Sequence, residues 1–335
     1  MIEVLMFPTG GNNSNAPLHA LLGALEPDIR VTPFGWKRAL FGKYDVLHVH
    51  WPERLLRASS PARSALVKVA FLALIARTRL TKAPVVWTVH NLRPHDGSSR
   101  LEQALLSAWT DSVLARVYLY PSAVESHRGQ RSAFIPFGDF QQVLDSNPTA
   151  PSSRAVHKRM VLFGVLKRYK GIEELIEAFR RFDDAEASLR IAGRPHDAKY
   201  AQELAGLVAD DSRITFTPRL LSYEELIEQV RTSELVVLPY KEMYNSGAAL
   251  LALTLKRPIL VPDSLTMNDL GAEVGERWVQ RYTAPLTPHK LRSALTQLSR
   301  DQAPEPPDLS GRGWATVGAA YSVLYRELVS DEREE

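Results

Sequence analysis

The chain has 335 residues, of which 45% are hydrophobic and 24% charged; this size and composition are typical of a globular protein with room for two domains. It contains no cysteine, which excludes disulfides and cysteine-ligated metal sites and agrees with a reducing cytoplasm. The net charge is only +3, so charge alone gives no general reason to expect a nucleic-acid partner.

Positive charge is nevertheless concentrated in one short segment, residues 54–82, which contains seven basic and no acidic residues. Its centre, residues 65–76, is apolar except for Lys68 and is too short to span a bilayer, which needs ~20 residues. Two interpretations remain open: a buried core helix, or a basic surface that contacts anionic lipid. No interleaved aromatic motif accompanies the charge, so we expect no nucleic-acid binding.

Strand-like and helix-like segments alternate along the first half of the chain. Short continuous apolar runs are typical of buried parallel strands, and they predict strands at 2–7, 46–49, 85–89, 116–120 and 133–136. Helical patterns lie at 17–25, 62–76 and 101–114. This alternation predicts an α/β fold with a parallel sheet.

A tract rich in Pro and Ser at 145–153 predicts a linker, and a second cycle of units follows it. Strands are expected at 159–164, 188–192, 213–216, 235–238, 258–261 and 277–281. Helices are expected at 172–182, 199–208, 223–231, 247–255, 288–298 and 314–328. We therefore predict two doubly wound, Rossmann-like domains facing a cleft, at 1–150 and 151–310, with a C-terminal helix at 311–335.

Three loops that follow predicted strands have features of a phosphate site. Ser246 and Gly247 open a helix, where free amides and the helix dipole favour an anion; the alternative is an ordinary turn with a Ser N-cap. Residues 163–171 carry Lys167, Arg168 and Lys170 before a helix, which indicates a diphosphate site or a solvated basic turn. The loop 9–15 contains glycines that would let a ligand approach, but it is not a dinucleotide motif.

Histidines gather at the ends of two strands in the first half. His48 and His50 precede Glu53, and His90 precedes His95 and Asp96. Ligands in open parallel sheets lie outside the carboxyl ends of strands, so His50, Glu53, His90 and Asp96 are expected to meet at one rim. Metal-ligand spacing is absent; acid–base work or hydrogen bonding to sugar hydroxyls suits this group better.

Together these stretches resemble a glycosyltransferase of the GT-B fold, close to the large retaining family 4 and its relatives, over nearly the whole chain. The resemblance rests on these segments: 45–51, 88–91, 135–139, 163–171, 189–193 and 214–219. Family 4 usually carries two glutamates eight positions apart, which would fall here at Met243 and Leu251; Glu242 is one position away. The form Tyr240-x5-Ser246-Gly-Ala is instead similar to polysaccharide and glycolipid transferases, some of which invert.

The resemblance implies transfer of a sugar from a UDP- or GDP-sugar to a hydroxyl acceptor, lipid-linked or a polysaccharide or glycolipid intermediate, without a metal or other cofactor. Retention is favoured weakly over inversion, and a nucleotide-sugar epimerase of the same fold is the other alternative. The expected donor-binding residues are Gly11, Gly164, Lys167, Lys170, Arg219, Tyr240, Asn245, Ser246 and Gly247. The expected catalytic residues are His90, with Asp96 or Glu53 as the alternative base, and Glu242 at the sugar.

The expected location is the cytoplasm, with peripheral contact at the inner face of the membrane through residues 54–82. The N-terminal apolar run is short and has no basic leader, so we do not expect a signal peptide.

Overall fold

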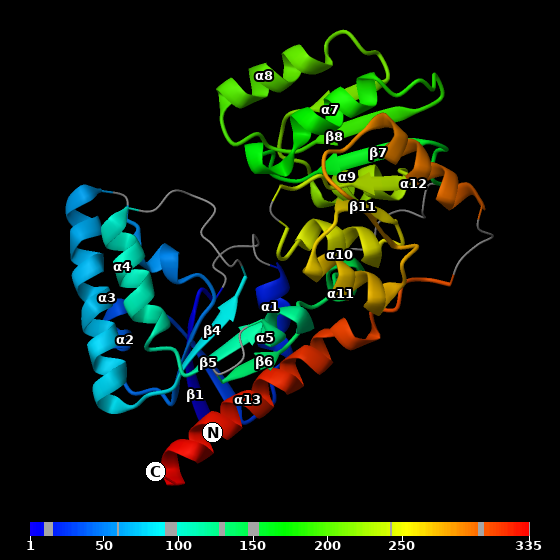
Figure 1. Cartoon of the computed structure of the whole chain (residues 1–335). Helices are drawn as coiled ribbons and strands as arrows, with labels where there is room; N and C mark the ends of the chain where they lie inside the picture. Colours follow the sequence, from blue (N-terminus) through cyan, green and yellow to red (C-terminus); the bar gives the residue numbers. More distant parts are fainter. Residues whose placement is uncertain are drawn as a thin grey trace. The chain divides into compact units, whose positions relative to one another are not determined.

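The computed structural model describes residues 1–9, 16–58, 60–90, 99–126, 131–146, 154–241, 243–300 and 305–334. The chain divides into two compact units: unit 1 contains Met1–Gly138 and Gly311–Glu335, and unit 2 contains Asp139–Ser310 (Figure 1). Each unit contains one six-stranded sheet, and all its strand pairs are parallel. The predicted α/β fold class with two Rossmann-like sheets is confirmed.

The strands of unit 1 follow the order β2-β1-β3-β4-β5-β6. Their bounds are β1 (Ile2–Phe7), β2 (Ile29–Pro33), β3 (Val46–Val49), β4 (Val85–Val89), β5 (Ala115–Tyr118) and β6 (Ser132–Phe134). The helices are α1 (Ala16–Ala24), α2 (Trp36–Phe41), η1 (Pro52–Leu56), α3 (Pro61–Thr81), α4 (Arg100–Thr110), α5 (Pro121–Glu125), η3 (Ser310–Arg312) and α13 (Trp314–Glu334).

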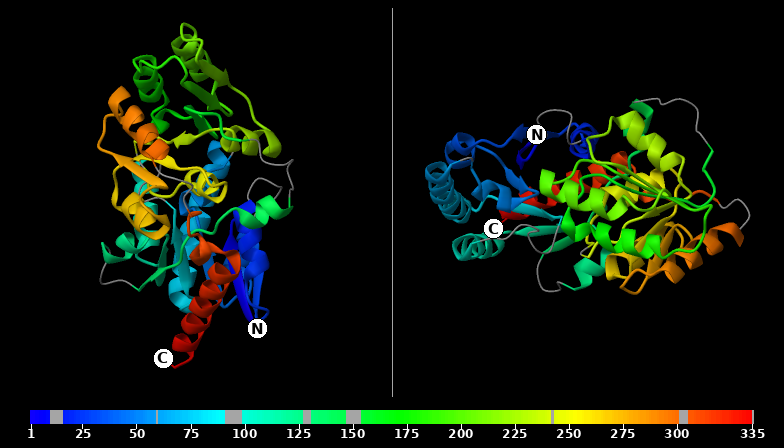
Figure 2. Two further views of the ribbon diagram at one scale, coloured as in Figure 1. Left: turned by 90° about the vertical axis from the view of Figure 1, so that its right-hand side faces the viewer. Right: turned by 90° about the horizontal axis from the view of Figure 1, so that it is seen from above.

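Side chains that alternate along these strands build two separate cores. Val4 belongs to the core that contains α1 and α13, whereas the adjacent Leu5 belongs to the core that contains α2, α3 and α4. This is the two-residue period of a strand buried on both faces. Figures 1 and 2 show α13 beside the N-terminal elements of unit 1. The last helix of the chain thus completes the first unit.

Unit 2 has the strand order β12-β11-β10-β7-β8-β9. Its strands are β7 (Arg159–Phe163), β8 (Ser188–Ala192), β9 (Ile214–Thr217), β10 (Leu235–Val237), β11 (Ile259–Pro262) and β12 (Val279–Tyr282). Its helices are α6 (Gln141–Ser146), η2 (Arg168–Lys170), α7 (Ile172–Arg180), α8 (Ala198–Val208), α9 (Tyr223–Arg231), α10 (Gly247–Thr254), α11 (Leu265–Val274) and α12 (Pro288–Arg300). One core joins α7, α8 and α12 to the sheet.

The structure differs from the predicted elements in several places. The sequence interpretation omitted β2, an edge strand in which only Ile29 and Thr32 are buried, and the short helices α2, α5 and α6 as well as α11. The first unit ends at Gly138, ahead of the predicted boundary at 150, because Phe140 already belongs to unit 2: its main-chain N–H donates to Thr254 Oγ1 at 3.3 Å. Most of the predicted linker, residues 147–153, lies outside the described residues.

Candidate functional site

Unit 2 brings three of the predicted donor-binding residues together at Lys170, the last residue of η2. The Lys170 side chain is 8% exposed, and its Nζ lies 4.8 Å from the centre of the Tyr240 ring. A Cβ placed on Gly164 would lie 3.4 Å from the same Nζ. Lys170, Gly164 and Tyr240 come from the ends of η2, β7 and β10, so the carboxyl edge of the sheet forms this group, which we call the lysine site.

Main-chain packing fixes η2 against the end of β10. Gly171 has a φ of +64°, and a Cβ at this position would lie 2.2 Å from the carbonyl oxygen of Pro239. Only glycine meets both requirements. The Lys241 N–H also donates to the Tyr169 carbonyl at 2.9 Å. The position of Lys170 is therefore set by backbone contacts on both sides.

The buried ammonium of Lys170 has no counter-charge in the described part of the chain: no carboxylate there lies within 4.0 Å of it. Burial and, to a smaller extent, the nearby charge of Lys167 together lower the pKa of Lys170 to about 8. A buried cation without a partner is unfavourable, and an anion bound beside it would raise the pKa again. The lysine site is thus built to accept an anion.

Other polar atoms near the end of β10 also have no partner among the described residues. They are Tyr240 Oη and Asn245 Oδ1, which are both buried. Burial raises the pKa of Tyr240, so its hydroxyl keeps its proton and can donate. Ser246 caps α10, its Oγ accepting from the Ala249 N–H at 3.2 Å. The segment that joins β10 to α10 therefore presents one free hydroxyl donor, Tyr240 Oη, which suits a phosphate oxygen, and one free acceptor, Asn245 Oδ1, which suits a hydroxyl group.

Two arginines of unit 2 are engaged elsewhere. The Arg168 guanidinium pairs with Glu203 and lies 4.6 Å from the centre of the Tyr200 ring, so its charge is neutralised at α8. Arg219 forms a two-pronged pair with Glu225, at 2.8 and 2.7 Å, on the exposed N-terminus of α9. Arg219 was expected beside Lys170 in the donor site, and its partner Glu225 belongs to the capping motif of α9. Arg168 was identified as a positive charge of the loop but was not among the expected donor-binding residues.

Unit 1 joins His50 and His90 at the ends of the neighbouring strands β3 and β4. His50 Nδ1 and His90 Nε2 lie 2.9 Å apart, and Trp51 stacks on His90 with 4.3 Å between the ring centres. Burial, then the neighbouring His50, holds the pKa of His90 well below its usual range, and burial lowers the pKa of His50 to about 3. Both imidazoles are therefore neutral at pH 7.

A second buried chain of hydrogen bonds connects this rim to α13. His48 Nδ1 lies 2.6 Å from the Tyr325 hydroxyl, and His48 Nε2 lies 2.8 Å from Thr88 Oγ1. Thr88 Oγ1 in turn lies 2.9 Å from the Tyr321 hydroxyl. Since both nitrogens of His48 are engaged inside the core, this histidine has a structural role.

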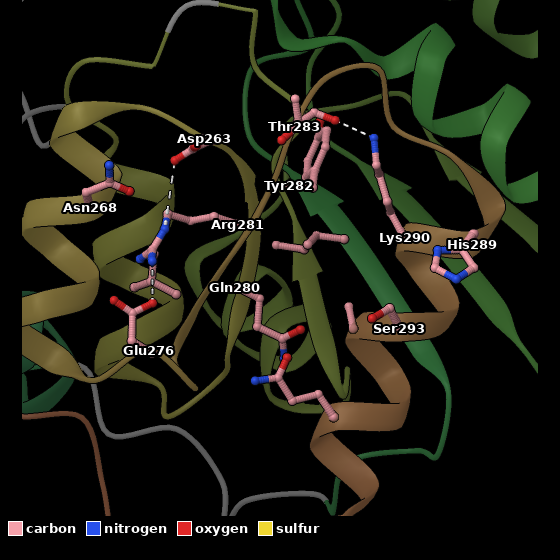
Figure 3. A pocket seen from close by; sticks show the side chains of 14 residues that line it. Asp263, Asn268, Glu276, Gln280, Arg281, Tyr282, Thr283, His289, Lys290 and Ser293 are labelled. Carbon is pink, nitrogen blue, oxygen red and sulfur yellow. Dashed lines mark hydrogen bonds and ion pairs between the residues drawn. The ribbon is translucent and has the colours of Figure 1, made fainter.

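A groove with a volume of about 790 Å³ lies beside β12 (Figure 3), and its basic side chains differ from Lys170 in having partners. Arg281 pairs there with Glu276, and Lys290 Nζ donates to the carbonyls of Thr283 and Pro285. These cations already have partners, unlike Lys170. None of the predicted site residues lines this groove.

Comparisons with known proteins identify the family. The family described as "Glycosyl transferases group 1" matches residues 157–301, which include the lysine site. A GDP-mannose:glycolipid 4-beta-D-mannosyltransferase of Xanthomonas campestris pv. campestris is 36% identical over 323 residues, covering 96% of this chain and 90% of the relative. The chain belongs to this glycosyltransferase family. It is accordingly an enzyme of the hexosyltransferase class.

Solved structures agree with this glycosyltransferase fold. AviGT4, a glycosyltransferase involved in avilamycin A biosynthesis, superposes with a TM-score of 0.59 at 13% identity and covers 98% of both chains. Anabaena Alr3699/HepE, solved with UDP and glucose, gives 0.57 at 13% identity, covering 100% of this chain and 99% of the other. The GT-B fold is thereby confirmed.

The remaining predicted residues of the glycosyltransferase fall into two groups. Gly11, Asp96 and Glu242 lie outside the described residues, so their predicted roles stay predictions. Glu53 lies half-buried in η1, and Lys167 immediately precedes η2. In the described part of the chain no group of three or more His, Asp or Glu side chains is arranged to hold a metal ion. Independence of metal remains a prediction.

Sequence reasoning did not assign a role to Trp51, which fixes the plane of the His90 ring. Trp51 lies in segment 45–51 of the family resemblance, but the ring that it stacks on belongs to His90, which is 39 residues away in sequence. In the sequence, the only indication of a role for Trp51 was that it is an aromatic residue next to His50. It is a positioning residue for His90.

The ion pair of Arg219 leads to a prediction for the glycosyltransferase. Arg219→Ala should change the KM for the donor by less than about twofold and leave the thermal stability nearly unchanged, because exposed ion pairs contribute little. Steady-state kinetics and thermal unfolding measure both quantities. A large rise in donor KM would instead restore Arg219 to the donor site, as the family resemblance implies.

Proposed function

We propose that the enzyme transfers mannose from GDP-mannose to a hydroxyl of a lipid-linked saccharide. The relative from Xanthomonas campestris, 36% identical over nearly the whole chain, supports both the donor and the glycolipid acceptor. Unit 2 binds the nucleotide and unit 1 supplies the groups that act on the acceptor. The enzyme needs neither a metal nor another cofactor for this chemistry.

The buried Lys170 ammonium without a carboxylate partner is the observation that carries this proposal. It neutralises the diphosphate as negative charge grows on the departing phosphate, which is where fixed donors accelerate a transfer most. Lys167 adds a second positive charge, and the Ser246 and Gly247 amides hold the phosphate at the N-terminus of α10. The Tyr240 hydroxyl donates to a phosphate oxygen, and Asn245 and Glu242 contact the sugar.

Inversion of configuration is the stereochemistry that we now favour over the weak preference for retention. Mannose is α-linked in the nucleotide donor, and the relative forms a β-linkage. Direct displacement from the opposite face inverts the centre and requires a base for the acceptor proton. His90 is that base: its Nε2 faces His50, which leaves Nδ1 to receive the proton. Asp96 and Glu53 are the alternative bases.

A lipid-linked acceptor places the enzyme at the cytoplasmic face of a membrane as a peripheral protein. In the described ranges, no helix combines the length and hydropathy needed to cross a bilayer. The basic segment 54–82 provides contact with anionic lipid headgroups.

Titration calorimetry with GDP, UDP and their sugars, followed by product analysis with lipid-linked saccharides, tests this function. We expect GDP to bind more tightly than UDP and a β-mannosylated lipid to form. An α-linked product would show retention. Release of an altered nucleotide sugar without any acceptor would identify an epimerase, and preferential binding of UDP would reject the proposed donor.

A further inference from the structure

The surface of α3 has an apolar strip that no described element of the chain covers. A helix that is apolar on both faces is normally buried on both. The inner face of α3 packs into unit 1 through Phe71, Leu74 and Ile75, which are all buried. The exposed residues of this helix include Arg63, Arg79 and Thr81. Eight further exposed residues are apolar and lie on its outward side: Ala62, Ala65, Leu66, Val69, Leu72, Ala73, Ala76 and Leu80.

These eight residues form one continuous band, which we call the α3 strip. At 100° per residue they fall within about one third of the helix circumference, and at 1.5 Å per residue they extend over about 27 Å. The large side chains stand well out of the protein: Leu66 is 68% exposed, Val69 64% and Leu80 86%. A contiguous exposed strip of this kind marks an interaction surface.

Positive charge lines both borders of the α3 strip. Helical spacing places Lys68 and Arg79 along one border and Arg63 and Arg77 along the other, and Lys82 follows the last turn. No acidic residue occurs between 54 and 82. Long basic side chains beside an apolar face can extend toward lipid phosphates while their stems rest on the apolar surface.

The structure corrects one part of the charge-based expectation for this segment. Arg77 donates to the carbonyls of Ala39 and Gly42 at the end of α2 and lies over the Tyr44 ring at 4.8 Å. Lys68 is paired with Glu102 at 3.1 Å. Arg79 Nη2 donates to the Ala108 carbonyl at 3.4 Å, but its side chain stays exposed and has no acidic partner among the described residues. The exposed side chains of Arg63, Arg79 and Lys82 therefore carry the charge that a partner meets.

We propose that the α3 strip inserts into the interface of an anionic bilayer, with the helix axis parallel to the membrane plane. Charge complementarity favours lipid over a second copy of the chain as the occupant. A two-fold contact between two α3 strips would bring the basic borders of both copies together without an acidic residue in this segment. Anionic headgroups supply the missing negative charge. The inference deepens the proposed lipid-linked function by naming the side chains that enter the membrane.

Vesicle binding by the full-length protein, without donor or acceptor, tests the insertion. The triple variant Leu66→Gln, Val69→Gln, Leu80→Gln should lower the partition coefficient on vesicles of phosphatidylcholine and phosphatidylglycerol at least tenfold. A matched double variant, Leu220→Gln and Leu265→Gln, removes leucines that are 74% and 65% exposed in unit 2 and should bind as the wild type does. Circular dichroism and thermal unfolding check that all variants fold.

A second measurement tests how deeply the α3 strip enters the bilayer. Because the chain has no cysteine, Val69→Cys carries a single environment-sensitive fluorophore, and brominated acyl chains should quench it on vesicles. Unchanged vesicle binding by the triple variant, or no quenching, would overturn the proposal. So would a wild-type dimer that the triple variant dissociates, since a second copy would then cover the strip. A wild-type protein that binds vesicles as expected but transfers no mannose would count against the proposed function alone.

Discussion

Lys170→Ala should abolish most of the transfer activity, with kcat about 10²–10³-fold lower. A hydrogen bond between charged groups contributes ~1.5–3 kcal/mol, so GDP should also bind at least about tenfold more weakly. The reason is that Lys170 is a buried cation without a carboxylate partner in the described part of the chain. Titration calorimetry with GDP and single-turnover kinetics measure the two effects.

Lys199→Ala is the matched control, because this lysine is exposed on α8. The variant should bind GDP as the wild type does.

The affinity for GDP should also depend on pH. With a pKa of about 8, the free Lys170 is charged below pH 8 and loses its proton above it, so GDP binding should weaken from pH 7 to 9. Lys170→Arg keeps its charge over this range and should flatten the profile. Undiminished GDP binding by Lys170→Ala would reject the lysine site as the donor site.

His90→Gln should lower kcat by about 10²–10⁴-fold, the contribution expected of a general base, while GDP binds as before. A base must be unprotonated, and burial holds the pKa of His90 well below its usual range. The rate should therefore persist as the pH falls through 6.5 and decline only at lower pH. The pH profile of kcat/KM for the wild type tests whether the rate declines only below pH 6.5.

His19→Gln is the control, since this histidine is exposed on α1. His50→Gln should lower kcat less than His90→Gln does, because His50 orients the ring across the 2.9 Å contact without receiving the acceptor proton. If His90→Gln retains full activity, the base is another residue; Asp96→Asn and Glu53→Gln then distinguish the two alternatives.

Much of the fold was predictable because it depends on local patterns. Continuous apolar runs such as those of β7 and β10 are readable as buried parallel strands, and their alternation with amphipathic helices such as α7 predicts the α/β class. The edge strand β2 was missed because polar residues interrupt it, only two of its five residues are buried and it ends in a proline. The boundary at Gly138 was missed because Phe140 is held by Thr254, 114 residues away.

The lysine site shows what a local sequence pattern does not predict: which of several neighbouring basic residues remains free to bind a ligand. The sequence identified Lys167, Arg168 and Lys170 as three positive charges in one loop, and the family resemblance selected Lys167 and Lys170 as donor-binding residues. Arg168 meets Glu203, which is 35 residues away, whereas Lys170 is buried against Tyr240. Which charge remains free for a ligand depends on partners that spacing within the loop does not encode.

By itself the sequence determined the two α/β domains, the phosphate-binding character of the loops after β7 and β10, and the gathering of histidines at β3 and β4. Only the tertiary structure decided that His50 faces His90, that Lys170 is the uncompensated cation, and that the outer side of α3 is uncovered. Local sequence patterns indicate whether a segment is a helix or a strand and which residue types follow it. Free charge and uncovered surface depend instead on long-range packing, which brings some partners into contact and leaves other groups without one.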